Sequence, residues 1–205
     1  QADEIIEREL GQPVGELFET ITPKPIASAS LGQVYRATRR EDGKEVAVKV
    51  QRPDVEEIVA LDLFLLKVGA GPLQFVLSVG STGLNTDLVG LVDAWGEGFV
   101  GELDYRQEAE NAREFNEAIA KTPLGSTVFA PQVVPECSSK KVLTSEWILG
   151  ERLELSTSGD VTKLCSVAMN TYLTMLLETG GLHADPHPGN LLRTPDGRLC
   201  ILDWG

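Results

Sequence analysis

Cysteine is scarce in this 205-residue chain, which contains only three. Cys137, Cys165 and Cys200 are an odd number of thiols at unrelated spacings. Cys165 and Cys200 lie within apolar patterns, so we predict that both are small buried side chains of a protein in a reducing compartment.

A long apolar run is also missing. No stretch reaches the roughly 18 apolar residues that a membrane-spanning helix requires. The nearest, residues 58–80, is interrupted by Asp62, Lys67, several glycines and a proline. No signal or transit peptide is visible. Because the chain begins with Gln1 and ends in Asp-Trp-Gly, we expect a fragment of a longer protein, for which missing targeting signals exclude little.

Basic residues are outnumbered, since 18 Lys and Arg face 31 Asp and Glu, with a net charge of −13. Non-specific nucleic-acid binding needs a basic face, so we predict no nucleic-acid partner. Arg39-Arg40 and Lys140-Lys141 are expected to be solvated turn residues rather than a patch for an anionic membrane. A chain of this length can form one domain or two small lobes, and it is long enough to bury a hydrophobic core.

The C-terminal segment carries the most informative pattern. Residues 183–190 are His-Ala-Asp-Pro-His-Pro-Gly-Asn, and the chain ends in Asp-Trp-Gly. Protein-kinase-like enzymes need an Asp and an Asn at this spacing, followed by a second Asp. Asp185 would accept a proton from the phosphoryl acceptor or orient it, while Asn190 and Asp203 would hold Mg²⁺ on ATP phosphates. The alternative is a proline-stiffened surface loop beside an unrelated turn.

A lysine in the middle of an apolar strand is the second candidate. Lys49 ends the sequence Val-Ala-Val-Lys, and a cleft-facing Lys among apolar neighbours is costly unless it meets an anion. In a kinase it would meet the α- and β-phosphates of ATP and a helix carboxylate. The alternative is an edge-strand Lys that blocks aggregation.

Small residues precede this strand, where a kinase would have its Gly-rich loop. Ala27, Ser28, Ala29 and Ser30 replace most of the glycines, and Val34 follows. Small side chains let backbone N–H groups approach phosphates, but each methyl group stiffens the loop. The alternative is an ordinary small-residue turn.

An acidic stretch, Glu-Leu-Asp-Tyr-Arg-Gln-Glu-Ala-Glu-Asn, begins at Glu102. On a helix, Asp104 and Glu108 lie one turn apart. A carboxylate in this stretch is a candidate to hold Lys49. The alternative is a solvated acidic face of a helix.

Apolar periodicity predicts an α+β protein with two lobes and a site between them. Helices are expected over residues 2–10, 53–68, a longer stretch after Gly98, and 161–179. Strands are expected over residues 21–29, 32–38, 45–51, 133–134 and 142–148. A hairpin is expected from residues 191–193 and 198–202 around Thr-Pro-Asp-Gly, and Gly150 is a plausible hinge.

Three motifs in this order are similar to the UbiB family of atypical protein-kinase-like proteins, also called aarF-domain kinases. They are Ala-Ser-Ala-Ser-Leu-Gly-Gln-Val, the acidic stretch above and His-Ala-Asp-Pro-His-Pro-Gly-Asn. The resemblance covers about residues 5–205 and implies a bilobal kinase-like fold. Residues 1–20 would end an N-terminal extension helix, 21–149 would form an N-lobe with an antiparallel sheet and helices, and 150–205 a truncated helical C-lobe.

The resemblance also assigns roles to the candidate residues. Residues 27–30 would be the family's Ala-rich loop, Lys49 the nucleotide lysine and Glu108 its helix partner. Glu102 and Asp104 would form a Glu-x-Asp motif that, with Val34, helps to bind nucleotide. The catalytic-loop Asp, the metal Asn and the metal Asp would be Asp185, Asn190 and Asp203.

Three departures from the family matter. Its Lys-x-Gly-Gln motif is absent from this sequence, and Trp204 replaces the usual Phe. With the rest of the helical lobe also missing, the fragment alone is expected to be inactive.

The resemblance implies ATP or ADP and Mg²⁺ as cofactors, and an ATPase or phosphotransferase of ubiquinone or plastoquinone-type prenylquinone metabolism. Membrane lipid or prenylquinone-pathway components would be partners, at the membrane periphery of a plastid or mitochondrion. One alternative is a small-molecule kinase of the aminoglycoside or choline kinase type. Another is a non-catalytic, nucleotide-gated scaffold that binds lipids. The phosphate acceptor stays open.

Overall fold

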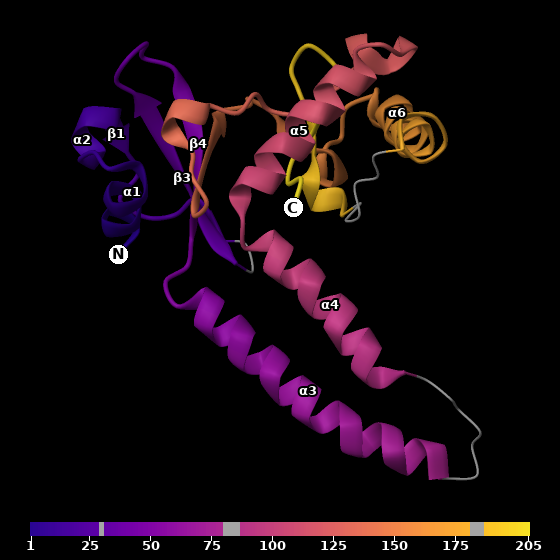
Figure 1. Ribbon diagram of the computed structural model, residues 1–205. Helices are drawn as coiled ribbons and strands as arrows, with labels where there is room; N and C mark the ends of the chain where they lie inside the picture. Colours follow the sequence, from indigo (N-terminus) through magenta and orange to yellow (C-terminus); the bar gives the residue numbers. More distant parts are fainter. Residues whose placement is uncertain (29–30, 80–86, 181–186) are drawn as a thin grey trace.

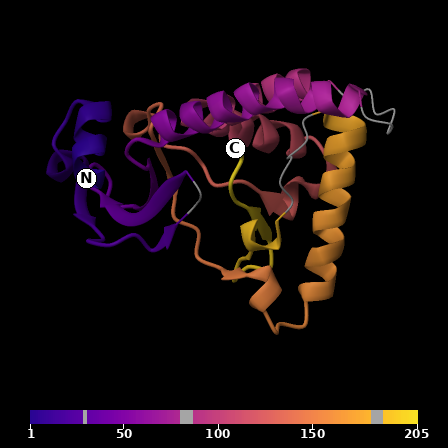
Figure 2. The ribbon, with the colours of Figure 1, turned by 90° about the horizontal axis from the view of Figure 1, so that it is seen from below.

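The computed structural model describes residues 1–28, 31–79, 87–180 and 187–205, and it combines helices with two β-sheets (Figure 1). Seen from below, the N-terminal sheet, the second sheet and helix α6 (Val161–Thr174) follow one another across the molecule (Figure 2). The α+β arrangement predicted from the periodicity is confirmed.

The N-terminal sheet has five antiparallel strands in the order β1–β3–β4–β6, with β2 paired to β3. They are β1 (Phe18–Ile21), β2 (Ala27–Ser28), β3 (Gly32–Arg39), β4 (Glu45–Gln51) and β6 (Val142–Glu146). A single strand over residues 21–29 is a wrong prediction. Pro23 and Pro25 lie between β1 and β2, and neither can donate a ladder hydrogen bond.

Strand β4 divides its side chains between a core and the opposite face. Val46, Val48 and Val50 are at most 2% exposed and belong to the core that includes α1 (Ala2–Leu10). Successive side chains of a strand point to opposite faces. Lys49 therefore points away from this core.

Three helices connect β4 to the rest of the chain: α3 (Val55–Val79), α4 (Leu88–Glu102) and α5 (Tyr105–Ile119). The helix predicted over residues 53–68 continues to Val79 and includes Pro72. Helix α4 was not predicted.

The longer helix predicted after Gly98 is present as α5, but it begins only at Tyr105. The chain breaks between α4 and α5, and Asp104 caps the start of α5 by accepting a hydrogen bond from the Arg106 N–H at 3.1 Å. Asp is a favoured residue at this position because its carboxylate satisfies a free helical N–H.

The second sheet has the order β5–β9–β8–β7. Its strands are β5 (Val128–Phe129), β7 (Glu151–Arg152), β8 (Leu191–Arg193) and β9 (Leu199–Ile201). The predicted hairpin is confirmed as β8 and β9, whereas the parallel strand β5 was missed. A strand over residues 133–134 is wrong, since Val133 forms only an isolated bridge with Ser145.

The remaining elements are short, apart from α6. Helix α6 continues as one π-helical stretch, Met175–Thr179, so the helix predicted over 161–179 is confirmed. A short helix α2 (Val14–Leu17) precedes β1. Single 3₁₀ turns are formed by Pro123–Ser126, Pro135–Cys137, Leu153–Leu155 and Pro188–Asn190.

The described residues form two hydrophobic cores, one on each sheet. The second core includes Phe115 of α5 and Val128 of β5 together with Leu199 of β9. The lobe boundary at residue 150 stays a prediction, but packing of the second core already begins within α5.

The cysteines separate into two buried thiols and one exposed thiol. Cys137 and Cys200 are buried, whereas Cys165 is exposed, so its predicted burial is wrong. Helix α6 buries Leu164, and the next residue of a helix points about 100° away. Within the parts of the chain that the structure describes, no helix is long and apolar enough to cross a membrane.

Candidate active site

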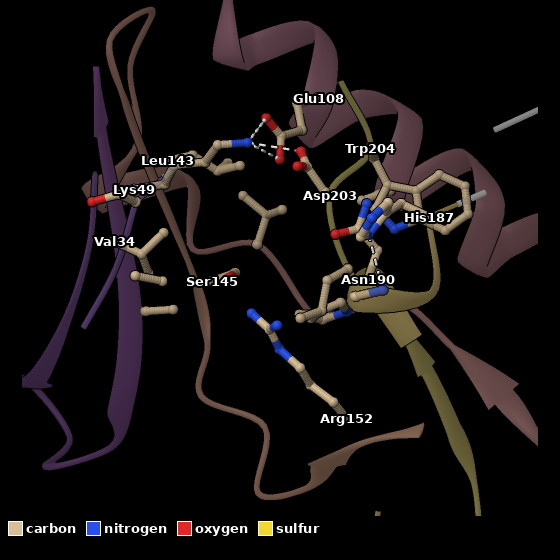
Figure 3. Close-up of a pocket in the computed structure, with 18 residues that line it drawn as sticks. Val34, Lys49, Glu108, Leu143, Ser145, Arg152, His187, Asn190, Asp203 and Trp204 are labelled. Atoms are coloured by element: carbon tan, nitrogen blue, oxygen red, sulfur yellow. Dashed lines mark hydrogen bonds and ion pairs between the residues drawn. The ribbon is translucent and has the colours of Figure 1, made fainter. Parts of the chain in front are cut away.

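A cavity of about 680 Å³ lies where the N-terminal sheet, α5 and the end of the second sheet meet (Figure 3). The sheet contributes Lys49 and its neighbours, α5 contributes Glu108, and the chain after β9 contributes Asp203. Asn190, directly before the β8–β9 hairpin, also lines the cavity. Residues far apart in the sequence thus meet at one place.

Lys49 forms the centre of the polar cluster in this cavity. Its Nζ donates to Glu108 Oε1 at 2.9 Å and Oε2 at 2.8 Å, and to Asp203 Oδ1 at 2.8 Å (Figure 3). The side chains of Lys49 and Glu108 are only 16% and 8% exposed. One ammonium therefore holds two carboxylates from different parts of the chain.

Helix α5 presents Glu108 to Lys49 because its buried face includes Glu108. The buried residues Tyr105, Glu108, Ala112, Phe115 and Ile119 recur at three- or four-residue intervals, which is the repeat of one helix face. Glu108 is the only charged member of this face. Its burial therefore depends on the ion pair with Lys49.

The charge balance keeps this lysine protonated. Burial would lower the pKa of Lys49, but Glu108 and then Asp203 outweigh it and hold the pKa above its ordinary value. Burial raises the pKa of Glu108, with Lys49 opposing the shift. The carboxylates of Glu108 and Asp203 around the single ammonium of Lys49 leave a net negative charge, which favours binding of a second cation.

Asp203 is placed by the residue that follows it. Trp204 is 6% exposed, its ring centroid lies 4.2 Å from that of Phe115, and its Nε1 donates to the Ile201 carbonyl at 3.0 Å. Asn111 of α5 donates to the Trp204 carbonyl at 2.9 Å. Asp203 itself has φ 57, a left-handed conformation that Asp tolerates better than most residues.

The loop before β8 positions Asn190. His187 Nδ1 accepts the Gly189 N–H at 3.0 Å, and the Asn190 N–H donates to the His187 carbonyl at 2.9 Å. The Leu202 N–H donates to the Asn190 carbonyl at 2.8 Å. The hairpin therefore returns the chain to Asn190 just before Asp203.

The small-residue segment lies partly at the cavity. Ala27 and Ser28 line it together with Val34, and β2 pairs Ala27 with Val34. Ala29, Ser30 and Asp185 lie outside the described residues. Their predicted roles stay predictions.

Glu102 and Asp104 are not brought to the cavity, although both were predicted to bind nucleotide. Glu102 is the last residue of α4 and is exposed. Asp104 caps α5 and pairs with Arg106, whose side-chain hydrogen bond lowers the pKa of Asp104. The structure thus gives Asp104 a capping contact, and no contact with Lys49 or Asp203 is found among the described residues.

Several lining residues were not predicted. Leu143 and Ser145 of β6 line the cavity and stand opposite Lys49 and Ala47 in register. Cross-strand partners share a face of the sheet, so pairing β6 with β4 would have identified them. Arg152 of β7 also points into the cavity (Figure 3), and the sequence carries no signal for it.

The donor set fits Mg²⁺ that also has ligands from a phosphate substrate. Asp203 offers a carboxylate and Asn190 an amide oxygen, and Mg²⁺ commonly takes one or two protein carboxylates plus phosphates and water. No group of three or more His, Cys, Asp or Glu side chains suited to a metal occurs among the residues that the structure describes. A cation held here would therefore depend on a second source of oxygens.

The chain is similar to known kinase-like proteins. Residues 1–205 match the family model of the ABC1 atypical kinase-like domain. The chain is 44% identical over 203 residues to an uncharacterized aarF domain-containing protein kinase of Arabidopsis thaliana, named chloroplastic, covering 98% of this chain and 28% of that protein. It is 43% identical over 205 residues to Activity of bc1 complex kinase 3 of the same plant, also named chloroplastic, with the same coverage of 98% and 28%.

A cyanobacterial relative extends the comparison. An uncharacterized protein of Synechocystis is 40% identical over 209 residues, covering 100% of this chain and 36% of that protein. The chain thus spans only 28% to 36% of the length of these relatives. The resemblance drawn from the three motifs is confirmed: the chain belongs to the ABC1 family of atypical kinase-like proteins, the aarF/UbiB group.

Proposed function

We propose that this domain binds MgATP in the cavity around Lys49 and supports phosphoryl transfer or ATP hydrolysis in a plastid. The plastid location is taken from the chloroplastic names of two relatives. A prenylquinone-pathway component or membrane lipid is the proposed partner, following the sequence resemblance, and the phosphate acceptor is not assigned. Since the chain spans a minor part of the length of its relatives, we propose this activity for the full-length protein.

The Lys49–Glu108–Asp203 cluster carries the proposal. Lys49 would donate to the α- and β-phosphates, and Glu108 would hold the ammonium in place. Asp203 and Asn190 would hold Mg²⁺, which neutralises phosphate charge when bound. Asp185, on the sequence pattern alone, would orient the attacking oxygen.

The apolar walls support a nucleotide as the ligand. Val34, Ala47, Leu143 and Leu202 line the cavity beside the charged cluster. A ligand with a flat apolar base and an anionic tail matches walls of this kind joined to a cationic end. The proposed orientation places the base between these side chains and the phosphates at Lys49.

The test is MgATP turnover by the full-length protein, with Asp203→Asn as the blank. Asn keeps a side chain that tolerates the left-handed backbone but removes the metal-binding charge. We expect turnover that depends on Mg²⁺ and falls by at least about 10²-fold in the variant. Turnover that is unchanged in Asp203→Asn would overturn the proposal, whereas tight nucleotide binding without turnover under any condition would favour a non-catalytic scaffold.

A further inference from the structure

Helices α3 and α4 form an antiparallel pair that extends away from both sheets (Figure 1). They are joined by the Lys67–Asp93 ion pair at 2.7 Å and by the close approach of Gly96 to Leu63. Large apolar side chains on this α3–α4 pair are nevertheless exposed. Phe64, Leu66, Leu73, Leu91 and Trp95 are each between 47% and 62% exposed.

The apolar surface is not confined to one stripe. Phe64 and Leu66 are two residues apart, so at about 100° per residue they point to nearly opposite sides of α3. Both are exposed, by 62% and 47%. A helix that packs on one partner surface shows a single apolar stripe, whereas a helix with apolar residues on several sides is buried, either within protein or in a membrane.

Charge is distributed unevenly along the pair. Glu56, at the end nearest the sheets, accepts from Lys140 Nζ at 2.6 Å and Lys141 Nζ at 2.7 Å. Beyond the Lys67–Asp93 pair, residues 68–92 contain Asp87 as their single ionisable side chain. The half of the pair furthest from the sheets is therefore almost uncharged.

We propose that this distal half of the α3–α4 pair docks on an uncharged lipid bilayer. Burial of apolar side chains supplies the attraction. An anionic surface fits poorly, because residues 55–102 carry seven acidic groups and one basic group, and the chain has a net charge of −13. Neither helix is long and apolar enough to cross a membrane, so the proposed contact is insertion into the interface.

This surface is separate from the nucleotide cavity, and the inference does not rest on the proposed function. Leu73 and Leu91 expose 53% and 59% of their surface on the distal half. Met169 of α6 and Leu177 of the π-helical stretch are 63% and 75% exposed elsewhere on the molecule. These two pairs make a matched comparison, since each double substitution removes two exposed apolar side chains.

The test is flotation of the full-length protein with vesicles of phosphatidylcholine alone, or of equal parts phosphatidylcholine and phosphatidylglycerol. We expect binding to the neutral vesicles that persists in high salt, and a loss of at least about tenfold in Leu73→Gln/Leu91→Gln. Met169→Gln/Leu177→Gln should bind like the parent. Trp95 borders the distal half and is 60% exposed, so its emission should shift to shorter wavelength on the vesicles, a change absent in Trp95→Phe.

Three results would overturn the inference. One is equal flotation of both double variants, and another is binding that needs phosphatidylglycerol and disappears in high salt. The third is a parent that does not float but whose sedimentation mass falls when Leu73 and Leu91 are replaced, which assigns the surface to a second copy. The melting temperature of the same samples shows whether a variant has misfolded. Their ATP affinity shows whether the nucleotide proposal fails independently of the membrane proposal.

Discussion

Lys49 Nζ lies 2.8 Å from Glu108 Oε2, although 59 residues separate the two in the sequence. The pair joins the centre of the N-terminal sheet to α5 and is largely buried. Because removing one partner of a buried ion pair leaves an uncompensated charge, such a contact is sensitive to single substitutions.

Glu108→Gln should lower the free energy of unfolding by about 1–3 kcal/mol, less than the usual cost of breaking a buried pair, because Asp203 still faces Lys49. ATP affinity should fall as well, since Lys49 loses the group that holds it in place. Chemical denaturation and calorimetric titration measure the two effects. Glu110→Gln, on the same helix in an exposed pair with Arg113, is the control and should change neither. Equal behaviour of the two variants would contradict a structural role for the buried pair.

Gly32 and Tyr105 should be coupled. A Cβ at Gly32 would lie 2.3 Å from the Tyr105 hydroxyl oxygen and 3.0 Å from the Val50 carbonyl oxygen. We expect Gly32→Ala to cost about 1–3 kcal/mol of stability. Tyr105→Phe should be nearly neutral, because the buried hydroxyl has no hydrogen-bond partner among the described residues.

The double variant distinguishes this contact from general damage. Gly32→Ala with Tyr105→Phe should recover most of the lost stability, because the overlapping oxygen is gone. Thermal and denaturant unfolding of the four proteins give the coupling energy. If the stability changes of the two single variants simply add in the double variant, the overlap at Gly32→Ala is relieved by movements that do not involve the Tyr105 hydroxyl.

Asp196 should make the β8–β9 hairpin acid-sensitive. Hydrogen bonds from Thr194 and then Arg198 lower the pKa of Asp196 from 3.8 to about 2. A carboxyl with a lowered pKa in the folded state stabilises the fold above its unfolded pKa, and this contribution is lost as the pH falls from about 3.8 to 2. Carbon-detected NMR titration should place the Asp196 midpoint near 2, and Asp196→Asn should remove this part of the acid sensitivity. A midpoint near 3.8 would show that the turn contacts are absent in solution.

Thiol labelling should discriminate among the cysteines. Cys165 is exposed, whereas Cys137 and Cys200 are buried, and burial raises the pKa of Cys200 to about 12. Since the thiolate is the reactive form, a short exposure of the native protein to iodoacetamide should modify Cys165 alone. Peptide mapping by mass spectrometry reports each site, with denatured protein as the reference. Rapid labelling of Cys200 would contradict its buried position in β9.

The site was more predictable than the fold around it. Lys49, Asn190 and Asp203 belong to motifs whose spacing has a chemical reason, and the structure places all three at one cavity. Glu102 and Asp104 belong to such a motif too, yet they lie away from the cavity. The sequence shows that Glu102 and Asp104 are polar and close together. The direction in which their side chains point depends on where α5 begins.

Errors in the fold have physical causes. Helices α3 and α4 are apolar on several sides, so amphipathic periodicity does not mark their limits. Strand β5 has two residues and pairs in parallel with β9, more than 60 residues later in the chain. Cys165 lies in an apolar stretch, and its exposure follows from the rotation of α6 about its axis, which the composition does not record.

Nucleotide affinity of Lys49→Met tests the central claim most directly. Calorimetric titration of the full-length protein with MgATP should show binding that weakens at least about tenfold in this variant. Lys44→Met removes the same charge from a side chain that is 76% exposed and should bind like the parent. If Lys49→Met binds MgATP as tightly as Lys44→Met does, the cavity around Lys49 is not the nucleotide site.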